Sequence, residues 1–285
     1  KLQKYRNKLR YLVGDVRDLQ RLEFATKNVD ILIHTAAMKH VLIAEYNPFE
    51  CIKTNINGAM HLIDAAIDRK VKGVVALSTD KASSPINLYG ASKLASDKLF
   101  VAGNSYAGAK NTRFSVVRYG NVMGSRGSIL PFFMSMDHSD GLPITDERMT
   151  RFMISLDEAV EWVWHALDDM VGGEIYVKKI PSMTVVDIAK AIAPKAKHRI
   201  IGIRPGEKLH EQMVSPEDAY YTYEYKGHFK ILPATDGLIP DKNKVKDGKQ
   251  VPSGFSYTSD NNPDWMSISE LEDWILSNKE RIGKI

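Results

Sequence analysis

Cysteine occurs once in the 285 residues, at Cys51, so the chain cannot form an intramolecular disulfide. Disulfides persist mainly in oxidising compartments, and we therefore expect this protein in the cytoplasm. Cys51 stands beside Ile52 in a predicted helix. We expect it to pack there as a small apolar side chain rather than to act as a nucleophile.

Long apolar runs are also lacking. No stretch approaches the ~18 residues that cross a bilayer, and no secretory pattern is seen, so we expect no membrane partner. The net charge of +4 suits an anionic small molecule but is too mild to indicate nucleic acid. The densest basic stretch, 242–249, is interrupted by Asn, Asp and Gly, which is typical of a solvated loop.

None of the 19 glycines falls in a G-x-G-x-x-G pattern, the usual pyrophosphate loop of dinucleotide-binding folds. A first strand, loop, helix and strand take about 30 residues. We therefore expect that the glycine loop and the first strand precede Lys1.

Short apolar runs alternate with helical patterns along the chain. Strands are predicted at 11–13, 30–34, 71–77, 114–117 and 174–177, and helices at 54–67 and from 89 to about 100. Such alternation indicates an α/β fold with a Rossmann-type parallel sheet. We predict a dinucleotide-binding domain over 1–180, with 121–150 contributing to a second lobe, and a mainly substrate-binding, loop-rich lobe over 181–285.

Three later helices carry N-terminal capping signals, at 155–158, 184–187 and 267–270. In the first of these helices the spacing predicts an inward face of Val160, Val163, Trp164 and Leu167. In the last, Leu271, Trp274 and Ile275 are expected to point inward.

Ligands of parallel sheets bind at the carboxyl ends of the strands. Three predicted strand ends carry suitable residues, namely Gly14-Asp15-Val16, Ala36-Ala37 and Ser78-Thr79-Asp80. We expect the chemistry at this edge.

Tyr89 and Lys93 stand four residues apart, so they share one helix face. Lys93 is expected to lower the pKa of Tyr89, so that the phenolate can act as a base. The spacing alone is weak, since Tyr106 and Lys110 repeat it. Tyr89 differs because it follows a strand end.

Asp80 and Lys81 place an acid beside a base at that strand end. Such a pair can remove one proton while delivering another. An isolated Asp-Lys dipeptide is usually a surface ion pair. Its position just before the Tyr89 helix favours a chemical role.

The segment from Leu77 to Lys93 closely resembles the inverting UDP-N-acetylglucosamine 4,6-dehydratases, soluble extended short-chain dehydrogenases of pseudaminic acid synthesis for flagellin glycosylation. The likeness continues through most of the chain, at 14–18, 36–41, 54–58, 118–128, 149–152, 204–211 and 257–262. Sugar 4-epimerases usually have Ser or Thr in place of Asp80-Lys81, and membrane-bound retaining dehydratases have Met in place of Tyr89.

The resemblance implies a mechanism with NADP, or NAD, as cofactor and UDP-N-acetylglucosamine as substrate. Tyr89 and Lys93 would assist hydride loss from C4, a neutral Lys81 would take the C5 proton, and a protonated Asp80 would donate to the departing C6 hydroxyl. Hydride would return to C6, and C5 would be reprotonated with inversion. It also implies a homo-oligomer.

The resemblance further implies the binding residues. The cofactor would meet Asp15, Val16, Ala36, Ala37, Lys39, Ser78, Thr79, Tyr89, Lys93 and Val122, and the sugar nucleotide Lys81, Asn121, Arg126, Arg204 and Glu207. His34, His40 and His210 lack metal-ligand spacing, so no metal is expected. The alternatives are a UDP-sugar 4-epimerase and a non-catalytic NADP-binding regulatory protein.

Overall fold

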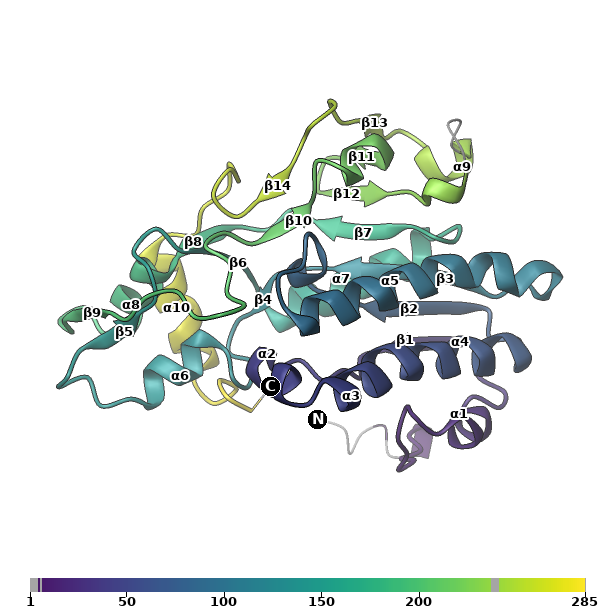
Figure 1. Ribbon diagram of the computed structural model, residues 1–285, viewed down its shortest axis with the longest axis horizontal. Helices are drawn as coiled ribbons and strands as arrows, with labels where there is room; N and C mark the ends of the chain where they lie inside the picture. Colours follow the sequence, from purple (N-terminus) through teal and green to yellow (C-terminus); the bar gives the residue numbers. More distant parts are fainter. Residues whose placement is uncertain (1–4, 6, 237–240, 285) are drawn as a thin grey trace.

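The computed structural model describes residues 5, 7–236 and 241–284. Its main sheet has seven strands in the order β1-β2-β3-β7-β12-β11-β13 (Figure 1). The first four are parallel to one another and the last three add antiparallel. Their bounds are Ile31–His34, Gly73–Leu77, Arg113–Arg118, Ile175–Lys178, His228–Ile231, Thr222–Glu224 and Lys249–Gln250.

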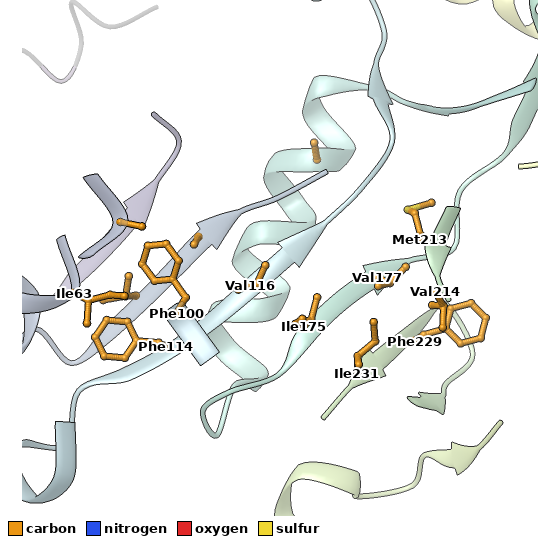
Figure 2. Close-up of a cluster of buried hydrophobic side chains, with 14 of the residues drawn as sticks. Ile63, Phe100, Phe114, Val116, Ile175, Val177, Met213, Val214, Phe229 and Ile231 are labelled. Carbon is orange, nitrogen blue, oxygen red and sulfur yellow. The ribbon is translucent and has the colours of Figure 1, made fainter. Parts of the chain in front are cut away.

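Helices cover both faces of this sheet because alternate residues of its strands point to opposite sides. Val74 and Phe114 pack on the side of α4 (Gly58–Asp68) and α5 (Leu88–Ala107). Val75 and Val117 pack on the other side, against α7 (Leu156–Asp169). Figure 2 shows the first cluster extending from Ile63, Phe100 and Phe114 across to Phe229 and Ile231. The expected α/β class with a parallel-dominant sheet is confirmed.

A smaller group of elements lies at one end of the sheet, at the left of Figure 1. It contains β5 (Leu142–Ile144), which pairs in parallel with β9 (His198–Ile200), together with α6 (Ile129–Ser135) and α8 (Val185–Ile192). Two apolar clusters of its own stabilise it. The predicted domain boundary at residue 180 stays a prediction. The strands β11, β12 and β13 come after this residue in the chain, and they extend the main sheet.

The remaining elements connect these two parts. A three-stranded sheet of β4 (Asn121–Val122), β6 (Thr150–Ile154) and β8 (Ser182–Thr184) leads from one to the other, and β10 pairs with β14. The other bounds are α1 Leu19–Ala25, α2 Val41–Tyr46, α3 Pro48–Ile52, η2 Lys53–Asn57, η3 Asp80–Ala82, η4 Gly108–Lys110, β10 Gln212–Val214, η5 Asp218–Tyr221, η6 Ala234–Asp236, α9 Lys242–Val245, β14 Tyr257–Thr258 and α10 Ile268–Asn278.

The predicted helix starts are confirmed. Ser155 and Ser267 both form full capping boxes, in which the serine hydroxyl and the glutamate three residues later satisfy each other's backbone N–H groups. The hydroxyl of Thr184 accepts from Asp187 N–H at the start of α8. Cys51 is fully buried in α3, as expected.

Two sequence predictions are wrong. Residues 11–13 form no strand, and Tyr11 and Val13 are 76% and 91% exposed, because no described strand hydrogen-bonds to this segment. In α7 the inward face is rotated from the predicted one. It buries Trp162 and Val163, whereas Val160 and Trp164 are 47% and 52% exposed. Trp162 turns inward because it packs against the rings of Tyr176 and His228.

Among the helices within the described ranges, none is both long and apolar enough to cross a membrane.

Candidate active site

The loop after β2 holds Asp80 and Lys81 in place through its backbone. Ser78 N–H donates to Val117 O at 2.7 Å, and Asp80 N–H donates to Tyr119 O at 3.2 Å, so pairing with the β3 side continues past the strand end. Thr79 then caps η3 by accepting from Lys81 N–H at 3.3 Å. The two side chains are therefore positioned by a rigid strand end, as the sequence predicts.

Lys81 lies between two buried carboxylates. Its Nζ is 3.0 Å from Asp80 Oδ1 and 2.9 Å from Oε1 of Glu211, the residue just before β10. The Asp80 and Glu211 side chains are 1% and 2% exposed, and Lys81 is 24% exposed. The sequence predicts the first contact but not the second.

The charges of these three groups depend on one another. Burial favours the neutral form of Asp80 and raises its pKa. Burial also works against the Lys81 ammonium, but attraction to Asp80 and Glu211 outweighs it and raises the pKa of Lys81. Burial also raises the pKa of Glu211, but attraction to Lys81 and Arg151 outweighs this effect and holds the pKa below its usual range. The expected neutral Lys81 is therefore wrong for this arrangement, which favours the ammonium.

Tyr89 and Lys93 lie on α5 and are 9% and 3% exposed. Burial raises the pKa of Tyr89 to about 12, against the opposing effects of Lys81 and of a hydrogen bond with Thr79. The Lys93 ammonium donates to Leu77 O at 2.7 Å, and burial lowers its pKa. Lys81 is a cation that lowers the pKa of Tyr89 here, and the expected effect of Lys93 stays a prediction.

A buried network joins α5 to the strands beneath it. Asp97 accepts from Ser78 Oγ at 2.7 Å and from Arg118 Nη2 at 3.3 Å, and Arg118 Nη1 also donates to Met213 O at 2.8 Å. Because Met213 lies two residues after Glu211, this network ties the Glu211 segment to β2 and β3. Sequence reasoning missed Asp97, Arg118 and Glu211.

Gly90 allows α5 to approach η3 closely. A Cβ at this position would lie 2.3 Å from the Lys81 carbonyl oxygen and 3.1 Å from Pro85 Cβ. These neighbours are backbone and a rigid ring, which cannot easily move aside. The absence of a side chain at Gly90 therefore sets the distance between the Tyr89 helix and the Asp80-Lys81 turn.

We expect Gly90→Ala to lower the free energy of unfolding by up to about 2 kcal/mol, because overpacking costs about 1–3 kcal/mol and the gain in helix propensity offsets only roughly 1 kcal/mol. Urea denaturation measures this change. Gly227→Ala is the matched control, since a Cβ there has nothing within 4 Å. A Gly90→Ala protein as stable as the control would contradict the packing argument.

A cavity of about 370 Å³ opens beside Lys81, within the usual size range of small-molecule sites. Four predicted substrate residues line it, namely Lys81, Asn121, Arg204 and Glu207. Arg126 is exposed and outside the lining, although Gly127 and Ser128 belong to it. Sequence reasoning missed the lining residues Arg151, Lys208 and Glu211.

The predicted cofactor residues lie outside this cavity lining. Ala36, Ala37 and Lys39 are exposed after β1, and Ser78 and Thr79 follow β2. Asp15 is exposed and paired with Arg17, Val16 contacts Gly58, and Val122 lies in β4. Their roles stay predictions. Within the described ranges, no three His, Cys, Asp or Glu side chains are placed to hold a metal ion.

Residues 1–233 match the polysaccharide biosynthesis protein family. The chain is 55% identical over 277 residues to an inverting UDP-N-acetylglucosamine 4,6-dehydratase of Campylobacter jejuni, covering 94% of this chain and 83% of the relative. It is 38% identical over 275 residues to a UDP-glucose 4-epimerase of Rickettsia akari, covering 95% of this chain and 80% of that one.

Two solved structures are similar. The X-ray structure of Pen from Bacillus thuringiensis superposes with a TM-score of 0.86 at 36% identity, covering 98% of this chain and 85% of that one. DesIV of Streptomyces venezuelae, a dTDP-glucose 4,6-dehydratase with NAD bound, gives 0.63 at 25% identity over 70% and 69% of the two chains. The resemblance seen in the sequence is confirmed, and the chain belongs to the polysaccharide biosynthesis protein family, alongside inverting UDP-N-acetylglucosamine 4,6-dehydratases.

Proposed function

We propose that this protein is an inverting UDP-N-acetylglucosamine 4,6-dehydratase. The observation that carries the proposal is the buried Asp80-Lys81 pair at the edge of the cavity, next to Tyr89. Elimination of water needs an acid and a base on one sugar, and this pair supplies both. The 55% identity to the Campylobacter jejuni dehydratase supports the same activity.

The reaction would need a nicotinamide cofactor, which would supply reversible hydride transfer for the C4 and C6 positions of the sugar. The small residues Ala36 and Ala37 after β1 leave the main chain exposed at the strand ends, which suits a flat dinucleotide. Ser78, Thr79, Tyr89 and Lys93 would complete its site, with Asp15, Val16, Lys39 and Val122. We propose NADP, and the NAD bound by DesIV supports the nicotinamide class.

The chain's own groups would carry the proton steps. Tyr89 takes the C4 hydroxyl proton, and the resulting ketone acidifies the proton at C5. Lys81 removes that proton while Asp80 donates to the departing C6 oxygen, which leaves as water. C5 is then reprotonated from the opposite face, which inverts that centre.

The cavity would hold the sugar nucleotide through charges and unpaired polar atoms. Arg204 would contact the pyrophosphate and Glu207 a ribose hydroxyl, while Asn121 and Arg126 would approach the sugar nucleotide from the opposite loop. Glu207 Oε2 is buried and has no partner among the described residues, so it is free to accept from a hydroxyl. We further propose a cytoplasmic homo-oligomer whose product enters pseudaminic acid or surface glycan synthesis.

The second candidate is a UDP-sugar 4-epimerase, favoured by the 38% identity to the Rickettsia akari enzyme. Mass spectrometry separates the two after incubation with UDP-N-acetylglucosamine and NADP. A dehydratase product is lighter by one water molecule, whereas an epimerase product keeps the mass of the substrate. Cofactor binding with no product at all would favour the non-catalytic alternative.

A further inference from the structure

Glu211 contacts Lys81 although the two residues are far apart in the sequence, and hydrogen bonds fix the backbone of Glu211. Its N–H donates to Ser259 Oγ at 2.9 Å, and its carbonyl accepts from Ser259 N–H at 2.8 Å. Ser259 in turn is 2.6 Å from Thr150 Oγ1, whose oxygen is also 2.8 Å from His210 Nδ1. The backbone of Glu211 is thus held by buried hydrogen bonds, and its carboxylate contacts Lys81 and Arg151.

A base at Lys81 must first lose a proton. In the structure its ammonium lies between two carboxylates, and the proposed function requires that Asp80 hold a proton for the departing oxygen. The second acceptor within hydrogen-bond distance is Glu211 Oε1, at 2.9 Å. Glu211 Oε2 is buried without a partner among the described residues, so protonation of this group breaks no other hydrogen bond described there.

We propose that Glu211 is a positioning residue for Lys81 that accepts the proton of the ammonium before Lys81 attacks C5–H. This inference rests on the proposed dehydratase function. An N–H bond of Lys81 breaks as an O–H bond forms on Glu211. The freed lone pair then takes the C5 proton while the Asp80 O–H proton passes to the C6 oxygen, which leaves as water. After this step Lys81 is again an ammonium, Asp80 is ionised and Glu211 is protonated.

Several charged groups face this pair from the surrounding elements. Asp80 lies on η3, and Tyr89 lies on α5. Arg151 Nε on β6 is 3.9 Å from Glu211 Oε1, and Lys208 stands three residues before Glu211. Burial opposes ionisation of Glu211, but Lys81, Arg151 and Lys208 lower its pKa. Glu211 is therefore ionised and the proton rests on Lys81 in the resting site, so the transfer to Glu211 is uphill there and would be transient.

The test is the pH dependence of water elimination by Glu211→Gln. We expect kcat near neutral pH to fall by at least about 10²-fold, with KM changed little, because the proton acceptor is lost. The rate should then rise steadily with pH, since Lys81 must release its proton to solvent. A wild-type rate, or a lower rate with an unshifted pH profile, would overturn the inference, because a merely structural defect does not move the profile.

Two further variants complete the design. Glu211→Asp keeps a carboxylate, so we expect it to retain part of the rate of water elimination and the shape of the wild-type pH profile. A pH profile like that of the Gln variant would contradict the inference. If Glu211→Gln fails to fold, a Glu211→Asp profile that rises steadily with pH would contradict it in the same way. The exposed Glu217→Gln is the control and should match wild type.

The wild-type assay comes first. If wild type eliminates no water, the proposed function itself fails; if it does, a normal Gln variant refutes only the role of Glu211.

Discussion

Water elimination from UDP-N-acetylglucosamine is expected to fall by at least about 10²-fold when Lys81 is replaced by alanine, the range lost with a general base. The C5 proton then has no base at the strand end. Tyr89 itself is unchanged, so transient reduction of the cofactor should persist, but more slowly, because the Lys81 charge that lowers the pKa of Tyr89 is lost. Product mass and cofactor absorbance, followed together, measure the two steps separately.

The loss of Lys81 also leaves Asp80 and Glu211 as buried carboxylates without their shared cation, and removing one partner of a buried pair costs about 3–5 kcal/mol. Thermal unfolding and nucleotide binding must therefore be checked in the same preparation. Lys98→Ala, at an exposed position on α5, is the matched control. Water elimination at the wild-type rate by a folded Lys81→Ala protein would refute the assigned role.

Replacing Tyr89 by phenylalanine is expected to abolish transient cofactor reduction, and with it all later steps. The ring keeps its packing beside Ala44 and Cys51, so the fold should survive. The hydroxyl that takes the C4 proton is lost. Because burial raises the pKa of Tyr89 to about 12, this proton transfer depends on nearby positive charge, and no other described hydroxyl is assigned to it.

Stopped-flow absorbance of the reduced cofactor measures this effect. Tyr106→Phe is the matched control, because Tyr106 is on the same helix with the same spacing to a lysine but is 68% exposed. An undiminished signal in Tyr89→Phe would show that another group removes the C4 proton.

Much of the fold follows from local pattern. The apolar runs at 71–77 and 114–117 form strands, because several consecutive buried residues suit a sheet covered on both faces. The run at 30–34 also forms a strand, although Ile31 and Ile33 are 46% and 38% exposed. The failures come from context. Residues 11–13 have strand-like composition but no described neighbour to pair with, and Trp162 packs against other rings where the helical spacing favoured Trp164.

Residue spacing alone predicted the candidate site only where its residues follow one strand, whereas Asn121, Arg204 and Glu207 were predicted from the family resemblance. Asp80, Lys81, Tyr89 and Lys93 stand within a single strand–turn–helix unit, so their proximity can be read from spacing. Glu211 reaches Lys81 only through tertiary packing, and nothing local marks it among the many acids of the chain. Its contact matters for the chemistry, because Glu211 adds to Asp80 in raising the pKa of Lys81 and so favours the ammonium. Local sequence cannot give such a charge state.

The most direct measurement of the central claim is NMR of the product formed from UDP-N-acetylglucosamine in deuterated water. The proposed chemistry predicts a 4-keto-6-deoxy sugar with deuterium at C5 and inverted configuration at that carbon, since the C5 proton is removed and returned from the other face. Protium retained at C5, or a product that has not lost water, would contradict it.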